Sequence, residues 1–219
     1  MKTNVTNKRQ RRPAERPDEI SSAALTLFCE RGYYPTTIDD VAAAAGVTKG
    51  AVYHHFDSKE QLLETAMESF LDQAIERAKS AMTGSDPSDV VNTLRIVLRA
   101  AAEMWISAEF SAVFCLVFGD VGKTVPGIRR TFLAAGPLRG WAAVAELIRR
   151  GQTSGKLRTD VDAHITARSL ACALALQSML LRASGYSKPR LMMAIDETLD
   201  VQLTMLANTT RESPGRSPR

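Results

Sequence analysis

The sequence predicts an all-α protein, with a small three-helix unit near the N-terminus followed by a larger helical bundle. Strand signals are almost absent along the 219 residues, whereas apolar residues return repeatedly at spacings of three and four. Hydrophobic residues make up 45% of the chain, which is enough for one large or two modest domains with a sizeable core.

The first predicted helix covers residues 17–31. Pro17 suits its first turn, and Gly32 follows its last residue. Asp18 and Glu19 place negative charge at the positive end of the helix. Its core-facing residues recur at helical spacing: Ile20, Ala24, Leu27 and Phe28. We expect this helix to support the two that follow.

The next stretch predicts a short second helix. Thr36 or Thr37 can serve as its N-cap. Asp39 or Asp40 stands three residues further on, where an acidic side chain completes a capping box. Gly46 occupies the position at which a left-handed residue ends a helix. One narrow apolar stripe can pack inward: Ile38, Val41, Ala42 and Ala45.

A third short helix is predicted directly after Gly46, with Val47 as a core plug and Thr48 as its cap. Its outward residues would be Lys49, Gly50, Tyr53 and His54. Two such helices form a helix-turn-helix, whose second helix enters the DNA major groove. Thr48 and Lys49 are the candidates for base-edge contact, since lysine donates to guanine and a threonine methyl meets thymine. Lys49, Tyr53 and His54 can donate to phosphate, and Gly50 lets the backbone approach closely.

Some of these residues have simpler interpretations. Tyr53 and His54 could be half-buried helix residues with a satisfied polar tip. Phe56 is expected to fill the core rather than stack on a base. Lys59 follows Ser58, whose capping box with Gln61 would aim free backbone N–H groups at a phosphate. The alternative for Lys59 is an ordinary lysine on a solvated face.

The remaining helices are predicted from breaks between apolar runs. A helix from Ser58 to about residue 81 is followed by a break at 83–87, and Pro87 suits the first turn of the next helix. After Ser107, the run AEFSAVFCLVFGDV is apolar nearly all round and predicts a buried helix, interrupted from Gly119 to Pro126. The last helices are expected at about 126–150, with a kink at Gly136-Pro137 that could make room for a ligand, and at 162–184 and 188–207.

Two further sites are expected in the bundle. Small and apolar residues on the last two helices suit pairing with a second copy of the chain, which would let a homodimer read a pseudo-palindrome. Large apolar and adaptable side chains suit a small hydrophobic or amphipathic effector. The candidates for its pocket are Met104, Trp105, Phe110, Phe114, Phe118, Trp141 and Met179, although such residues more often form ordinary core.

Residues 16–63 resemble the N-terminal DNA-binding domain of the TetR family of bacterial transcriptional regulators. The resemblance is carried by Ala23-Ala24, Leu27-Phe28, Gly32, Thr36-Thr37-Ile38, Asp40-Val41-Ala42, Ala45-Gly46-Val47, and the runs KGAVYHHF at 49–56 and SKEQLL at 58–63. A weaker likeness lies in the turn from Arg150 to Asp162. The resemblance implies phosphate contacts from Thr37, Tyr53, His54 and Lys59, base or groove contacts from Thr48, Lys49 and Gly50, and a dimer formed through a four-helix interface.

The expected domains are a disordered basic arm at 1–15, the helix-turn-helix domain at 16–63, an effector-binding and dimerisation domain at 64–207, and a disordered tail at 208–219. The net charge of +4 permits nucleic-acid binding without demonstrating it. No signal peptide or membrane span is expected, so the protein is placed in the cytoplasm. Cys29, Cys115 and Cys172 are expected to be buried free thiols, and no metal site or cofactor is expected.

The predicted function is a ligand-responsive transcriptional regulator that binds a double-stranded DNA operator. It is expected to act as a repressor that a small-molecule effector releases. One alternative is a DNA-bound scaffold controlled by a protein partner. A helical ligand carrier is disfavoured by residues 32–63, and an enzyme by the lack of a phosphate-binding glycine loop or a nucleophile with its base.

Overall fold

The computed structural model describes residues 17–84, 86 and 88–207. The basic arm expected at 1–15 and the tail expected at 208–219 lie outside this part of the chain. All the regular elements that it contains are helices, which confirms the all-α prediction. The chain divides into two compact units, of which the first ends at Ala66 and the second begins at Met67. We call them the head and the bundle.

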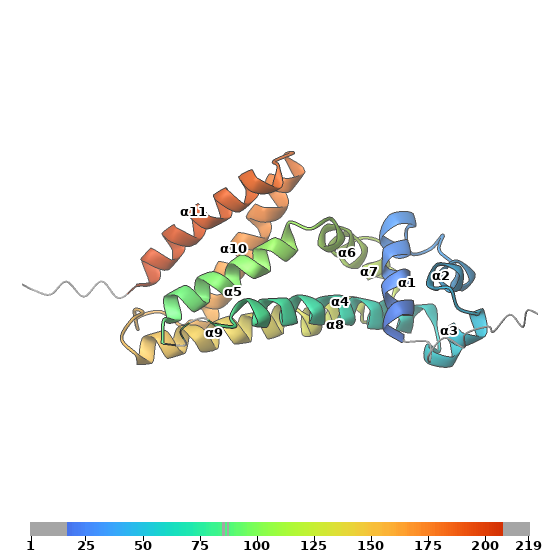
Figure 1. Cartoon of the computed structure of the whole chain (residues 1–219), viewed down its shortest axis with the longest axis horizontal. Helices are drawn as coiled ribbons and strands as arrows, with labels where there is room; N and C mark the ends of the chain where they lie inside the picture. The colour runs from blue at the N-terminus through green and yellow to red at the C-terminus, as the bar shows by residue number, and fades with distance from the viewer. Residues whose placement is uncertain (1–16, 85, 87, 208–219) are drawn as a thin grey trace, which may run out of the picture. The chain divides into compact units, whose positions relative to one another are not determined.

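The head contains α1 (Pro17–Arg31), α2 (Ile38–Ala45), α3 (Lys49–His55) and the first residues of α4 (Lys59–Ala81) (Figure 1). Each of these helices buries one face, and the buried residues form a common core: Ile20, Ala24, Phe28, Val41, Val52 and Leu62. The Phe28 and Tyr33 rings lie 5.2 Å apart within this core. The predicted inward residues of α1 are therefore confirmed.

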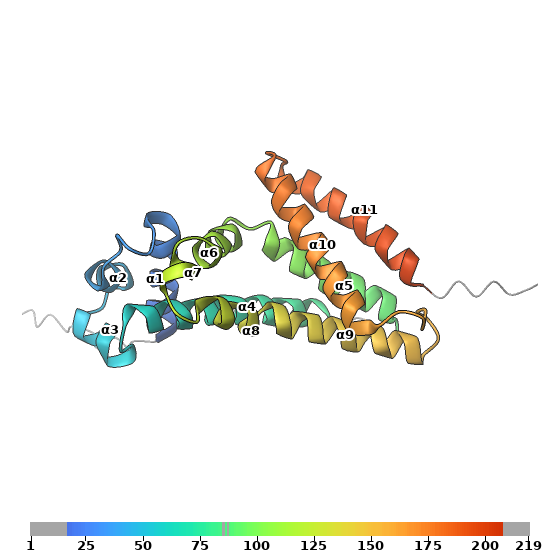
Figure 2. The same ribbon diagram turned by 180° about the vertical axis from the view of Figure 1, so that it is seen from behind.

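The rest of α4 belongs to the bundle with seven further helices. They are α5 (Val90–Trp105), α6 (Ala108–Phe118), α7 (Val121–Thr124), α8 (Ile128–Ala135), α9 (Pro137–Thr153), α10 (Ala163–Ala183) and α11 (Lys188–Leu206). Figures 1 and 2 show α10 and α11 side by side, with α5 next to them. The main core lies among α5, α9, α10 and α11 and includes Leu94, Leu98, Ile148, Leu174, Ile195 and Leu199.

Two helix boundaries differ from the prediction. Pro87 lies outside the described residues, and α5 begins only at Val90 because Asp89 is its N-cap, accepting a hydrogen bond of 3.1 Å from the Asn92 N–H. The interruption after Gly119 contains the single-turn helix α7. This turn forms because Val121 and Val125 both pack into the bundle, where they are buried.

The predicted break at Gly136-Pro137 separates α8 from α9. On the side that faces α4 the break is closely packed. A Cβ placed on Gly136 would lie only 3.0 Å from Cδ2 of Leu71, a residue of α4 that is itself buried. The Arg139 guanidinium, one turn into α9, also pairs with the Asp72 carboxylate of α4. The break is therefore packed against α4.

The turn between α9 and α10 follows from its residues. Gly151 allows the buried Leu157 to fold back on the end of α9, since a Cβ there would lie 2.5 Å from Leu157 Cδ1. Gly155 supplies a left-handed residue with φ of 72°. Asp162 then caps α10 by accepting a hydrogen bond of 2.8 Å from the Ile165 N–H.

Two burial predictions are wrong for this single chain. The apolar helix α6 buries only one face, through Phe110, Val113 and Val117, and the Phe118 side chain is 41% exposed. Two of the three cysteines that were expected to be buried, Cys115 and Cys172, are exposed, and Cys29 is half-buried. Both exposed cysteines lie on the outward faces of their helices. Apolar neighbours in the sequence are therefore not enough to predict that a cysteine is buried.

By length and composition alone, one described helix, α10, could cross a membrane. The helix α5 and the segment α6–α7 meet the same criterion only when they are taken together as one bent span. The inward face of α10 packs in the bundle core through Ala167, Leu170 and Leu174. Its apolar character is therefore partly explained by the fold.

Candidate nucleic-acid interface

The second helix of the head is fixed at both ends by local hydrogen bonds. Thr37 is its N-cap, and the capping box is made with Asp40: the Thr37 N–H donates to Asp40 Oδ2 over 2.8 Å, and the Asp40 N–H donates to Thr37 Oγ1 over 3.2 Å. Hydrogen bonds from the Thr37 hydroxyl and backbone lower the pKa of Asp40. Gly46 ends the helix with φ of 68°. The tight turn into α3 is therefore set by the sequence itself.

The third helix presents one face to solvent. Thr48 caps it by accepting a hydrogen bond of 3.2 Å from the Ala51 N–H. Ala51 and Val52 are buried in the head core. The residues predicted to read DNA are exposed on the other side, and we call them the reading face: Thr48, Lys49, Gly50, Tyr53 and His54.

Aromatic residues along α3 divide between the reading face and the core. The Tyr53 side chain is 50% exposed, and the exposed His54 ring lies 5.0 Å from that of His55. Phe56, directly after the helix, is only 4% exposed and fills the core as predicted. The polar tips of Tyr53 and His54 are therefore open to a ligand.

Lys59 lies in a different environment from the reading face. Its Nζ is 4.3 Å from the centre of the Tyr33 ring and 5.9 Å from that of Phe28, and it donates to the Tyr34 carbonyl over 3.4 Å. Burial lowers the pKa of this lysine. The Tyr33 hydroxyl donates to Glu60 over 3.1 Å, and burial followed by this hydrogen bond raises the pKa of Tyr33. A phosphate bound at the start of α4 would therefore have to compete with the Tyr34 carbonyl for the Lys59 ammonium.

The capping box expected at the start of α4 is only partly formed. The Gln61 N–H donates to Ser58 Oγ over 3.1 Å, as predicted. The Gln61 side chain accepts from the Asp57 N–H over 2.5 Å, not from that of Ser58.

An ion pair that the sequence did not predict lies beside the reading face. Lys49 Nζ donates to Asp39 Oδ2 over 2.9 Å, and this hydrogen bond is the main cause of the raised pKa of Lys49. The sequence indicated Asp39 only as an acid in the first turn of α2 and, with Asp40, as a candidate for the capping box, which the structure assigns to Asp40. Its proximity to Lys49 depends on the geometry of the turn between the helices.

The effector candidates are only partly brought together. Phe114 and Phe118 rings lie 4.5 Å apart on α6, with Phe110 at 6.4 Å from Phe114. Phe132 of α8, which the sequence did not single out, completes this cluster at 5.8 Å from Phe118. The other four candidates, all half-buried, come from three other helices: Met104, Trp105, Trp141 and Met179. Trp105 packs against the main bundle core instead.

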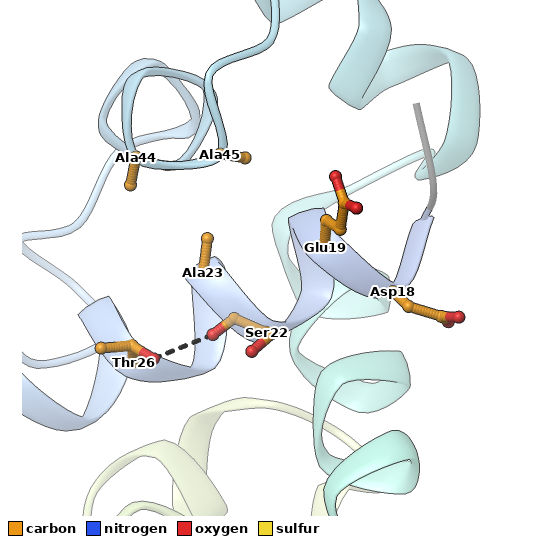
Figure 3. Close-up of a pocket in the computed structure, with 7 residues that line it drawn as sticks. All are labelled: Asp18, Glu19, Ser22, Ala23, Thr26, Ala44 and Ala45. Atoms are coloured by element: carbon orange, nitrogen blue, oxygen red, sulfur yellow. Dashed lines mark hydrogen bonds between the residues drawn. The ribbon is translucent and has the colours of Figure 1, made fainter. Parts of the chain in front are cut away.

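A separate groove of about 520 Å³ lies in the head between α1 and α2 (Figure 3). Its lining residues are Asp18, Glu19, Ser22, Ala23, Thr26, Ala44 and Ala45. The acidic side chains at one end disfavour phosphate. The groove is therefore distinct in chemistry from the reading face and from the expected effector pocket.

Together, the fold and the reading face define a helix-turn-helix DNA-binding protein with a separate helical bundle. Residues 20–74 match the family described as bacterial regulatory proteins, tetR family, and residues 92–207 match the C-terminal domain of AefR-like transcriptional repressors. The chain belongs to the tetR family. It is a DNA-binding transcriptional repressor and not an enzyme, and regulators of this family bind DNA operators and act as dimers.

Similar proteins cover most of the chain. The transcriptional repressor KstR2 of Rhodococcus jostii (strain RHA1) is 32% identical over 71% of this chain and 74% of its own. The transcriptional regulator CymR of Pseudomonas putida is 35% identical over 55% of this chain and 59% of its own. The crystal structure of FadR from Bacillus subtilis, in complex with stearoyl-CoA, superimposes with a TM-score of 0.68 at 17% identity, covering 85% of this chain and 97% of FadR.

Proposed function

We propose that this repressor binds a pseudo-palindromic operator as a homodimer and is released by a small hydrophobic or amphipathic molecule bound in the bundle. The observation that carries the proposal is the outward presentation of Lys49, Tyr53 and His54 on a helix whose other face is buried. Two such helices about 34 to 36 Å apart would enter successive major grooves of one duplex. The site of action would be the cytoplasm, on chromosomal DNA.

The homodimer is supported by apolar side chains on the outer faces of the last two helices. Leu176 and Leu180 of α10 are 60% and 59% exposed, and Val201 and Met205 of α11 are 60% and 68% exposed. Residues four apart share one helix face, so each helix carries a continuous apolar stripe. A second copy that covers both stripes would remove this surface from water.

The effector is supported by the phenylalanine cluster of α6 and α8. Phe118 and Phe114 are not fully covered by their own chain, so apolar surface remains there for a ligand. Stearoyl-CoA, which occupies the related FadR fold, is an amphipathic molecule of the kind that such a cluster would accept. We propose Phe110, Phe114 and Phe118 as contacts for the apolar part of the effector.

A protein partner is the second candidate for the controlling ligand. Leu133 and Leu138, on α8 and α9, are 36% and 53% exposed. With Phe118 they offer apolar side chains that a partner could cover. Binding of this partner would then replace small-molecule binding as the regulatory signal, and pull-down with the purified partner would detect it.

The operator is identified by sequencing genomic DNA fragments that the purified full-length protein retains. A shared pseudo-palindrome is expected among them. Retention of random fragments only, with no common site, would contradict the proposed function.

Gly50→Ala separates DNA contact from fold stability. A Cβ at Gly50 would have Thr48 Oγ1 as its nearest neighbour at 3.9 Å, so alanine fits, and a stabilisation of about 0.5–1 kcal/mol is expected. If the α3 backbone approaches DNA closely, the added methyl lowers operator affinity about tenfold. Thermal unfolding and fluorescence anisotropy measure the two effects. Gly140→Ala, in open space on α9, is the matched control and should leave operator affinity unchanged.

Release by an effector requires thermodynamic linkage. A molecule from a panel that begins with stearoyl-CoA should lower operator affinity about 5- to 150-fold, and operator DNA should weaken its binding by the same factor. Calorimetry with and without operator measures both quantities. A molecule that binds the bundle with equal affinity in both experiments would not be the releasing effector.

A further inference from the structure

The ion pair between Asp39 and Lys49 has no clear role in stability. Their side chains are 67% and 53% exposed, and their atoms Oδ2 and Nζ lie 2.9 Å apart. Exposed ion pairs of this kind contribute little to folding, because water and salt screen them. The pair also joins the start of α2 to the start of α3, two helices that lie beside each other in Figures 1 and 2.

Asp39 differs in this respect from its neighbour Asp40. The Asp40 carboxylate accepts hydrogen bonds from both the backbone N–H and the hydroxyl of Thr37, so it is committed to the helix cap. Asp39 is not needed for that cap. Its negative charge, next to the reading face, would also repel DNA phosphates. A carboxylate at this position therefore costs non-specific DNA affinity unless it contributes something else.

Base recognition is a contribution that fits the geometry. In the major groove a G·C pair presents the guanine O6 and N7 acceptors beside the cytosine N4 amino donor. Lysine donates to guanine, and aspartate accepts from cytosine N4. The Asp39–Lys49 pair holds one acceptor and one donor side by side, which is the complement of that pattern.

We propose that Asp39 and Lys49 act as one unit that reads a G·C base pair in the operator, with Asp39 as a specificity-determining residue. This inference rests on the proposed binding of the reading face in the major groove. Asp39 accepts from cytosine N4, keeps Lys49 directed at the guanine edge, and disfavours its diversion to a phosphate. Tyr53, one turn beyond Lys49 on α3, keeps a separate contact.

The test uses the full-length protein and the operator found by fragment capture. Each G·C pair of one half-site, and its symmetry mate, is changed to A·T, and the affinities of the wild type and Asp39→Asn are compared on every duplex. At one position the change to A·T should lower the affinity of the wild type about 5- to 150-fold per half-site. Asp39→Asn should lose most of that discrimination between the two base pairs. Asp39→Asn should also bind random-sequence DNA several-fold more tightly, since one negative charge is removed.

Two further variants make the result specific. Asp18→Asn removes the same charge from an exposed position on α1, and it should leave base discrimination unchanged. Lys49→Met should lose discrimination at the same base pair as Asp39→Asn, and the double variant should lose no more than either single one. Thermal unfolding checks that each variant remains folded.

The outcomes separate this inference from the proposed function. If Asp39→Asn discriminates between base pairs at every position as the wild type does, the inference that Asp39 and Lys49 read a G·C pair as one unit is overturned, while operator binding stays in place. Loss of discrimination at different positions in Asp39→Asn and Lys49→Met would overturn their joint action. A wild type with no sequence preference at all would overturn both the inference and the proposed function.

Discussion

The double variant Leu176→Asp/Leu180→Asp is expected to be a folded monomer that binds the operator about 10²- to 10⁴-fold more weakly than the wild type. Both leucines are largely exposed on α10, so aspartate can be accommodated in the isolated chain. In a dimer the same positions would be covered, and two carboxylates from each copy would be desolvated without partners. A monomer holds a single reading face, so the second half-site no longer adds to binding.

Sedimentation equilibrium measures the change in mass, and fluorescence anisotropy measures operator affinity. Leu138→Asp is the matched control, because this leucine is 53% exposed but lies on α9, outside the α10 and α11 stripes. It should remain a dimer with unchanged operator affinity. A double variant that stays dimeric and binds normally would show that the interface lies elsewhere on the chain.

The sequence predicted those parts of the head whose conformation depends on interactions between residues close together in the chain. The Thr37–Asp40 capping box, the left-handed Gly46 and the Thr48 cap each depend on groups no more than four residues apart. Such interactions are readable from residue type and spacing alone. They also fix the turn that presents the reading face, so the residues of this face follow from the same local pattern.

Contacts between distant residues were not predictable in the same way. Lys59 meets Tyr33 and the Tyr34 carbonyl, about 25 residues away, only because α4 packs beside the turn after α1. Phe132 joins the phenylalanine cluster because α8 returns to α6 after the α7 turn. The burial of Cys115 and Phe118 was overestimated for a related reason. An apolar run shows that a face can be covered, but not whether its own chain covers it.

Phe28→Ala is expected to unfold the head while the bundle stays folded. The Phe28 side chain is 1% exposed, its ring lies 5.2 Å from that of Tyr33, and the Lys59 ammonium lies above it. Truncation of a buried phenylalanine costs about 3–5 kcal/mol. A compact unit of roughly fifty residues has a free energy of unfolding of only about 3–7 kcal/mol. One substitution therefore removes most of the stability of the head.

The expected result is a dimeric protein with reduced helicity and no measurable operator binding. Circular dichroism, sedimentation equilibrium and anisotropy measure these three properties on the same sample. Phe28→Leu keeps most of the buried volume, so it should lower the free energy of unfolding of the head much less and retain operator binding. Because the apolar stripes proposed for the dimer and the main core lie in the bundle, the alanine variant should also keep the bundle's own unfolding transition. Simultaneous loss of the dimer and of that transition would mean that the head and the bundle fold as one cooperative unit, and the stability of the reading face would then have to be assigned to the whole chain.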